Sequence, residues 1–403
     1  MCSVGDDVDE EKAKFMEKKE LPNLTNSLCI KCRTSKPQIV LHNQYPYCKA
    51  CFISGTVHKF KALLGKNRIV RFNESVLIHH RTGHASTALL HFLRTGLDLS
   101  TPKKIQFKPV VVYIEKNYNI DINERIRLSC QVNAEVTRFH FPIFFINLSQ
   151  YLVNKSNLSS ILHEKVDDMR IDENDSIKIK NVLKNNPNLT VQTEMVDIYE
   201  NELLIKVAKH LGCKCIFTPD LGVDIASQLL TNVSLGRGEN IPYDTGTTDL
   251  RDCDVTVMRP LRNFTIKELA LYNYYNAIEP VSFVRKIKNP YSSIQNLTEK
   301  FVSDLQANYP ATISTIVRTG DKLGMSNEVL IDKCVLCQVP IRKENKSLGS
   351  AEATNFSHWV STQTVNSDAS LKDHTSLILS TFDNNKYNKY CYSCNQISPY
   401  LCQ

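Results

Sequence analysis

Eight of the fourteen cysteines fall into two sets whose spacing is typical of metal sites. Each set contains two Cys-x-x-Cys pairs, separated by 15 residues in the first set and by 53 in the second. Four thiolates with no open position suit a structural zinc ion. The predicted zinc ligands are Cys29, Cys32, Cys48 and Cys51 at the first site and Cys334, Cys337, Cys391 and Cys394 at the second.

Six cysteines stand outside these sets: Cys2, Cys130, Cys213, Cys215, Cys253 and Cys402. An iron–sulfur cluster on three of them remains an alternative. Cys213 and Cys215 could form a redox pair, but a Cys-x-Cys at the start of an apolar run favours buried packing. Disulfides are not expected, because the acidic N-terminus has no apolar core of the kind a secretory signal needs. We therefore expect a cytosolic or nuclear protein.

A possible phosphate loop lies in residues 76–93, which read VLIHHRTGHASTALLHFL. A short apolar run meets a polar turn, and a helix-like stretch begins near Ser86. This order is how α/β proteins seat a phosphate on backbone N–H groups at a helix N-terminus. The turn has one glycine, Gly83, and no carboxylate to hold a magnesium ion. These residues alone leave open a working nucleotide loop, a broken one or an ordinary turn.

Basic residues gather just before this loop. The stretch from His58 to Arg71 reads HKFKALLGKNRIVR and contains no acid, within a chain of net charge +7. The pattern is typical of a solvated helix face or of a surface that contacts nucleic-acid phosphates. The candidate RNA contacts are Lys59, Lys61, Lys66, Arg68 and Arg71.

Strand-like and helix-like runs alternate between the two cysteine sets. The expected strands are Val76–Ile78, Val110–Ile114, Ile143–Ile146, Cys215–Thr218 and Val255–Met258. The expected helices lie near Ser86–Thr95, Glu124–Arg138, Glu200–Leu211, Asp224–Val233 and Ile266–Tyr275. Apolar strands that alternate with helices predict a parallel sheet covered on both faces, with ligands at the carboxyl ends of its strands. Chemistry is therefore expected at the loop of Gly83 and at residues 218–220.

Length and composition indicate several domains of a globular protein. The chain has 403 residues, 42% of them apolar and 23% charged, and no apolar run of the roughly 20 residues that a membrane helix needs. We expect a disordered tail (1–28), a zinc module with a basic helix (29–70), an α/β domain (71–285), a helical segment (286–333) and a zinc ribbon with a long polar insertion (334–403). Residues 155–189 are expected to form a surface insertion, and Pro310 to begin an amphipathic helix.

The whole order of features resembles the cytoplasmic tRNA 2-thiolation protein 2 family. The resemblance covers nearly the entire chain, and it is carried by the two cysteine frames, the loop after the first strand, GENIP and MRPLRNFTIKELALYNYY. That family supplies the second subunit of the eukaryotic wobble-uridine thiolase and is related to the PP-loop ATPases. The resemblance implies a parallel-sheet α/β domain, PP-loop-like (adenine nucleotide alpha hydrolase-like), flanked by N- and C-terminal zinc-binding modules.

Two loops depart from the PP-loop pattern. Against S-G-G-x-D-S, residues 81–86 keep only Gly83 and Ser86, and Ala85 removes the carboxylate. Side chains at the two positions before Gly83 crowd a close approach of phosphate, and loss of the metal ligand should be severe. Against T-G-H-N-A-D-D, the second loop keeps Thr218 and Asp224, while Phe217 replaces a cysteine that handles sulfur. The resemblance thus implies a degenerate nucleotide loop at Gly83, Ser86, Thr87, Thr218 and Asp224, with Cys215 leaving room for residual sulfur chemistry.

The resemblance also implies partners and cofactors. The chain would pair as a heterodimer with the catalytic subunit, thiolation protein 1, and bind tRNA in the cytoplasm without contacting a membrane. Together they would thiolate the wobble uridine of the tRNAs for lysine, glutamate and glutamine, with sulfur from a thiocarboxylated ubiquitin-like carrier of the protein urmylation pathway. Zinc would occupy two structural sites here, and ATP and an iron–sulfur cluster would bind only to the partner. The alternatives are an adenylating thiolase in its own right and a zinc-ribbon adaptor for nucleic acid or protein.

Overall fold

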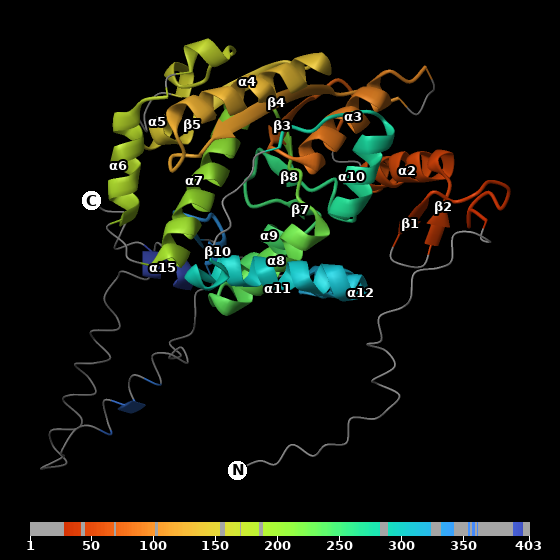
Figure 1. The fold of residues 1–403 in the computed structure, drawn as a ribbon. Helices are drawn as coiled ribbons and strands as arrows, with labels where there is room; N and C mark the ends of the chain where they lie inside the picture. Colours follow the sequence, from red (N-terminus) through yellow and green to blue (C-terminus); the bar gives the residue numbers. More distant parts are fainter. Residues whose placement is uncertain are drawn as a thin grey trace, which may run out of the picture. The chain divides into compact units, whose positions relative to one another are not determined.

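The computed structural model describes residues 28–41, 45–67, 70–100, 104–153, 158–169, 171–184, 188–282, 289–323, 332–341, 354, 357, 358, 361 and 390–397 (Figure 1). The expected tail before residue 28, Arg68 and most of the expected insertion from 343 to 386 lie outside these residues. The chain divides into two compact units, residues 1–325 and 326–403.

A mostly parallel sheet of six strands forms the centre of the first unit, in the order β5-β4-β3-β6-β8-β7. The strands are β3 (Ser75–His80), β4 (Lys108–Glu115), β5 (Ile143–Asn147), β6 (Cys215–Phe217), β7 (Thr248–Asp249) and β8 (Thr256–Met258). All neighbours pair in parallel except β7, which runs antiparallel to β8. The predicted α/β class with a parallel sheet is confirmed, and each of the five predicted strands is present.

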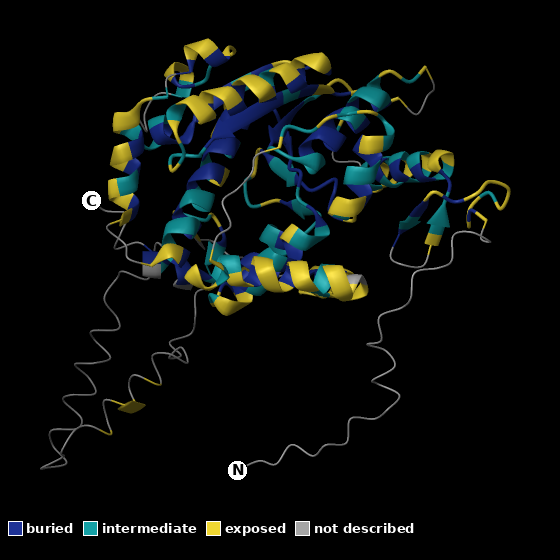
Figure 2. Cartoon of the chain, in the orientation of Figure 1, coloured by how far each residue is buried: buried dark blue, intermediate teal, exposed yellow. Residues whose placement is uncertain are grey.

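The central strand β3 is apolar because helices cover both faces of the sheet. Val76, Leu77 and Ile78 are at most 1% exposed, and Figure 2 shows the centre of the sheet in the colour of buried residues. Successive side chains of a strand point to opposite faces. A strand buried on both sides therefore loses the apolar–polar alternation of a half-exposed one.

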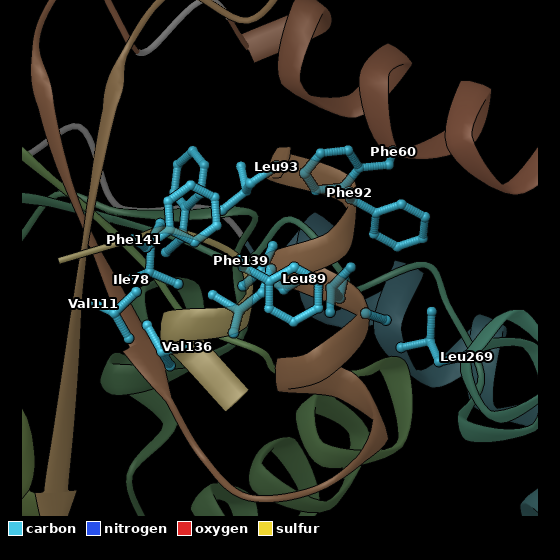
Figure 3. Packing of buried hydrophobic residues seen from close by; sticks show 14 of the residues in the cluster. Phe60, Ile78, Leu89, Phe92, Leu93, Val111, Val136, Phe139, Phe141 and Leu269 are labelled. Atoms are coloured by element: carbon cyan, nitrogen blue, oxygen red, sulfur yellow. The ribbon is translucent and has the colours of Figure 1, made fainter. Parts of the chain in front are cut away.

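One face of the sheet packs against α3 (His84–Leu97), α4 (Ile122–Arg138), α10 (Ile266–Tyr275) and the long helix α2 (Lys49–Asn67). The ring of Phe60 on α2 stacks on that of Phe92 on α3, with 4.9 Å between centroids (Figure 3). Leu269 on α10 and Val136 on α4 belong to the same core. Because Phe60 is fully buried in this core, the basic helix that follows the first cysteine site is anchored to the α/β domain.

Three helices form a second, smaller core: α8 (Gly222–Ser234), α11 (Ile294–Asn308) and α12 (Pro310–Lys322). Ile225 of α8, Val302 of α11 and Ile313 of α12 are buried in this cluster. Pro310 occupies the first turn of α12, where its missing N–H costs no hydrogen bond. The predicted amphipathic helix at Pro310 is confirmed.

The expectation that residues 155–189 form only a surface insertion is wrong. Ile161, Val166 and Met169 are buried, and the backbone of His163 forms a β-bridge to Phe145 of β5. These apolar residues are scattered among charged ones, so no periodic hydrophobic pattern in the sequence predicts that they are buried. The segment contains the helix α6 (Glu173–Lys184), whose Ile179 is also buried.

The remaining elements are short, except for the 22-residue helix α7. They are the hairpin β1 (Ile39–Leu41) and β2 (Tyr45–Tyr47), the helices α5 (Leu148–Val153), α7 (Leu189–His210) and α9 (Ile241–Thr245), and the 3₁₀ turns η1 (Leu158–Ser160), η2 (Val166–Asp168), η3 (Gly238–Asn240) and η4 (Pro290–Ser292). The second unit contains β9 (Asp332–Lys333) paired with β10 (Pro340–Ile341), and α15 (Tyr392–Ile397). Within the described residues, no helix combines the length and apolarity that crossing a membrane requires.

Candidate functional site

The strand order places one topological switch point in the sheet. From β3 the chain first adds β4 and β5 on one side, and it then adds β6 and β8 on the other. In such sheets, ligands bind outside the carboxyl ends of the strands at the point where the order reverses. The loops that follow β3 and β6 meet there, and these are the two loops singled out from the sequence.

Within the first loop, the polar groups satisfy one another. Gly83 has φ 116° and ψ 176°, a backbone conformation that favours glycine, and it caps α3. The backbone N–H of Arg81 donates to the hydroxyl of Ser86 at 2.9 Å. The hydroxyl of Thr87 lies 3.1 Å from the carbonyl oxygen of Gly83 and also donates to Glu135. Ser86 and Thr87 thus hold the turn and the neighbouring helix α4.

An ion pair joins the two loops. Nη1 of Arg81 lies 2.6 Å from Oδ1 of Asp220, and the hydroxyl of Thr218 donates to Oδ2 of Asp220 at 2.6 Å. Nε of Arg259 lies 3.6 Å from the same Oδ2. Burial alone would raise the pKa of Asp220, but the two guanidinium groups outweigh it and lower that pKa. The carboxylate is therefore ionised at neutral pH, and the pair occupies the switch point.

The other residues of the second loop have structural contacts. Asp224 is exposed, and its carboxylate accepts a hydrogen bond from the N–H of Leu221 at 2.9 Å, which caps α8. Phe217 is fully buried and packs edge-on against Phe107. Burial raises the pKa of the Cys215 thiol to about 12, so that Cys215 carries no thiolate for sulfur chemistry at neutral pH.

The side chains of two adjacent histidines at the end of β3 point to opposite faces of the sheet. His80 Nε2 lies 3.1 Å from Oε2 of Glu135 on α4, and His79 Nε2 lies 3.4 Å from Oε1 of Glu200 on α7. Burial lowers the pKa of His79, although Glu200 opposes this effect. Lys116 Nζ lies 2.5 Å from the other oxygen of Glu200. Burial would raise the pKa of Glu200, but Lys116 and His79 bring it well below its ordinary value.

The first cysteine quartet has the compactness of a single-ion site. Its four sulfur atoms lie within 4.8 Å of one another, and those of Cys32 and Cys48 are 3.9 Å apart. A tetrahedral ion with bonds of about 2.3 Å requires sulfurs roughly 3.8 Å apart. Cys29 and Cys32 precede the hairpin β1-β2, whereas Cys48 and Cys51 lie at the start of α2. One ion there would join the hairpin to the helix.

The second quartet has the same geometry in the second unit. Its sulfur atoms also lie within 4.8 Å of one another, and those of Cys337 and Cys391 are 3.6 Å apart. Among the described residues, no third group of cysteine, histidine or acidic side chains is this close. Cys130 and Cys253 are exposed, while Cys213 and Cys215 are buried. Cys2 and Cys402 lie outside the described residues, so the iron–sulfur alternative on the leftover cysteines stays a prediction.

The candidate RNA contacts differ in their surroundings. Nζ of Lys59 lies 3.0 Å from Oε1 of Glu268 and 4.4 Å from the ring centroid of Phe264, so its charge is already paired. Lys66 and Arg71 are exposed. Lys61 is half-buried on the same helix, α2. Arg68 lies outside the described residues.

Sequence reasoning singled out residues 218–220 but gave neither Asp220 nor Arg259 a role of its own. It treated Asp220 only as a departure from a glycine–histidine pattern, and it quoted Arg259 only within a motif. A carboxylate and an arginine at the carboxyl ends of neighbouring strands β6 and β8 were visible in the sequence. Their partner in the loop after β3 becomes evident only once the strand order is known.

Comparisons with known proteins agree with this architecture. The family model described as cytoplasmic tRNA 2-thiolation protein 2 matches residues 293–396. The protein of that name from Aedes aegypti is 31% identical over 80% of this chain and 73% of its own length. The one from Drosophila erecta is 30% identical over 85% of each chain.

A solved structure shares the fold. It is described as the U34-tRNA thiolase NcsA from Methanococcus maripaludis with its [4Fe-4S] cluster. It superposes with a TM-score of 0.53 at 17% identity and covers 81% of this chain and 93% of its own. At this identity the likeness supports the fold alone. The identities to the insect relatives, by contrast, extend over most of both sequences, and the chain belongs to the cytoplasmic tRNA 2-thiolation protein 2 family.

Proposed function

We propose that this protein is a non-catalytic, tRNA-binding subunit of a cytoplasmic thiolase that modifies the wobble uridine of the tRNAs for lysine, glutamate and glutamine. It pairs as a heterodimer with a catalytic PP-loop subunit of the thiolation protein 1 type. That subunit binds ATP and an iron–sulfur cluster, adenylates the uridine carbonyl and transfers sulfur from a thiocarboxylated ubiquitin-like carrier. Family membership supports the reaction class, and the relatives' shared name supports the cytoplasmic address.

The ion pair between Arg81 and Asp220 is the observation that carries the non-catalytic assignment. Both residues depart from the PP-loop pattern, in different loops, and they neutralise each other at 2.6 Å. A nucleotide phosphate at this position would have to displace Asp220 from Arg81 and then lie beside that carboxylate. Phosphoryl-type transfer depends on positioning and on charge neutralisation by a metal ion, and Ala85 provides no ligand for one.

Descent from a PP-loop enzyme has separate support in the fold. The five parallel strands run in the order typical of a doubly wound nucleotide-binding sheet. The loop at Gly83 still opens a helix at the switch point, as a phosphate loop does. We therefore interpret the loop as a nucleotide loop retained for its structure.

Each cysteine quartet is proposed to hold one structural zinc ion. The four sulfurs of each set are close enough for a tetrahedral ion, and four thiolates leave no position for a substrate. A structural zinc ion contributes free energy of folding and takes no part in a reaction. The sulfur atoms of a multi-iron cluster bind different irons and lie farther apart, so the compact quartets favour a single ion.

The test is pyrophosphate release. The full chain alone, incubated with ATP, magnesium and unmodified tRNA, should release none, while a catalytic homologue with an intact S-G-G-x-D-S loop should release it. Ala85→Asp should not restore activity, because the Arg81 pair still fills the loop. Adenylated tRNA formed by this chain alone would instead identify an adenylating thiolase.

A pull-down tests the partnership. The full chain should co-purify with a PP-loop homologue whose loop is intact, and an Ala85→Ser variant should support wobble-uridine thiolation in that complex as the wild type does. Loss of thiolation from this variant in an assembled complex would contradict the proposal. Absence of both the homologue and tRNA from the purified material would favour the adaptor alternative.

A further inference from the structure

A groove of about 790 Å³ lies between α2, the segment from Arg262 to Thr265, and α12. Lys59 and Lys66 line it from α2, Arg262 from the segment before α10, and Arg318 from α12. All of these elements belong to the first unit. The groove joins helices that are more than 200 residues apart in the sequence, so no sequence motif marks it.

Most charges in the groove are paired within the protein. Arg262 holds Asp321 through two hydrogen bonds of 2.8 and 3.1 Å, and Lys59 is paired with Glu268. Lys66 and Arg318 are exposed, and neither forms an ion pair with any residue that the structure describes. The groove therefore presents two positive charges, from two different helices, that have no ion-pair partner in the described part of the chain.

The rest of the lining combines polar and apolar groups. The exposed Asn263 and the half-buried Gln306 offer side-chain amides. Ile313 and Val317 of α12 line the groove while packing against α8, and Leu63 adds an apolar side chain from α2. Unpaired cations beside amides and an apolar surface are what a sugar–phosphate strand with unstacked bases requires.

We propose that this groove binds an unpaired stretch of RNA, with Lys66 and Arg318 contacting backbone phosphates from the two sides. Its volume is that of a small-ligand pocket, which admits a single strand and excludes a duplex. Gly222 also lines it, two residues after Asp220, so the groove adjoins the carboxyl edge of the sheet. RNA in this groove lies next to the switch point, where folds of this kind place their ligands. The inference rests on the proposed tRNA-binding function and assigns it a location.

Binding of unmodified tRNA to the full chain, measured across a range of salt concentrations, tests the groove. The variant Lys66→Ala/Arg318→Ala should flatten the slope of log affinity against log salt by about 1.4, because each contact to a single strand contributes roughly 0.7. Lys267→Ala/Lys322→Ala is the control, since it removes the same charge from exposed positions of α10 and α12 that lie outside the groove lining. Its slope should equal that of the wild type. Arg318→Lys in the wild-type background should keep the wild-type slope, and thermal denaturation should show every variant folded.

Each contrary result has a distinct meaning. An unchanged slope in the groove variant, or an equal loss in the control variant, overturns the groove while leaving tRNA binding intact. AMP or inorganic triphosphate that binds the wild type and not the groove variant, with tRNA binding unaffected, identifies a free-nucleotide site and also overturns it. A wild-type chain without salt-sensitive tRNA binding overturns the proposed function itself.

Discussion

Arg81 and Asp220 lie 139 residues apart in the chain, yet the guanidinium nitrogen of one is 2.6 Å from the carboxylate oxygen of the other. The contact links the loop after β3 to the loop after β6, the two strands on either side of the switch point. In a working nucleotide site both loops would face a ligand. Here they face each other.

Breaking the Arg81–Asp220 pair should destabilise the fold without removing an activity of this chain. Arg81→Ala and Asp220→Ala should each lower the free energy of unfolding by about 1–2 kcal/mol, because each leaves a charge without its main partner. The Arg81 side chain is 39% exposed, so the coupling energy in a double-mutant cycle should be only about 1 kcal/mol. Urea unfolding of the four proteins measures both quantities. Additive effects of the two substitutions would show that the pair does not hold the loops together.

Zinc should be present at about two ions per chain. Cys29→Ala should remove one ion and unfold the hairpin with the start of α2, since a structural zinc ion contributes on the order of 10 kcal/mol to such a module. Cys130→Ala, which changes an exposed cysteine outside both quartets, is the control and should leave the metal content unchanged. Elemental analysis decides the matter. Iron in place of zinc, or no metal at all, would refute the assignment.

Acid should destabilise the protein partly through His79. Burial lowers the pKa of this histidine in the folded state, whereas in the unfolded chain it has the ordinary value near 6.5. Protonation then favours the unfolded chain, and stability is lost as the pH falls below about 6.5. The charged groups that act on the imidazole are Glu200, Arg81 and Lys116.

A histidine substitution isolates this contribution. His79→Gln should make the loss of stability between pH 7 and pH 5.5 less steep, as measured by urea unfolding with excess zinc present. His58→Gln, at an exposed position of α2, is the matched control and should leave the slope unchanged. An identical pH dependence in the His79 variant and the wild type would be the contrary outcome.

Lys59 should contribute mainly to the stability of the fold, and Lys66 should contribute mainly to tRNA binding. Lys59→Ala removes the partner of Glu268, whose side chain is only 8% exposed, together with a contact to the ring of Phe264. Because Lys59 itself is 36% exposed, the expected loss is about 0.5–1 kcal/mol. Lys66→Ala should leave the free energy of unfolding within about 0.5 kcal/mol of the wild type. Equal stability of the two variants would contradict this division of roles.

The strands and their order of appearance could be predicted from the sequence for a clear physical reason. A strand buried on both faces is largely apolar, and β3, β4 and β5 each contain a continuous apolar run. The edge strand β7 could not be found in this way, since its two residues are Thr248 and Asp249. Its place depends on pairing with β8, which is a property of the folded chain.

The sequence predicted the cysteine quartets and the two loops of the site, but it did not predict which of their side chains contact one another. The cysteine quartets were evident because the two ligands of each knuckle are close in sequence. The pairing of Arg81 with Asp220, and the approach of Arg318 to the basic helix, depend on strand order and helix packing. Residues brought together by tertiary structure leave no spacing in the sequence to detect.

The second cysteine quartet has a consequence for how the chain tolerates changes in length. Its two halves enclose 53 residues, against 15 in the first quartet. For a flexible segment, closing the longer loop costs only about 1 kcal/mol more, because the entropy of closure grows with the logarithm of length. A structural metal ion would contribute on the order of 10 kcal/mol at either quartet. The number of residues between Cys337 and Cys391 could therefore change severalfold while altering the closure entropy of this quartet by only about 1 kcal/mol.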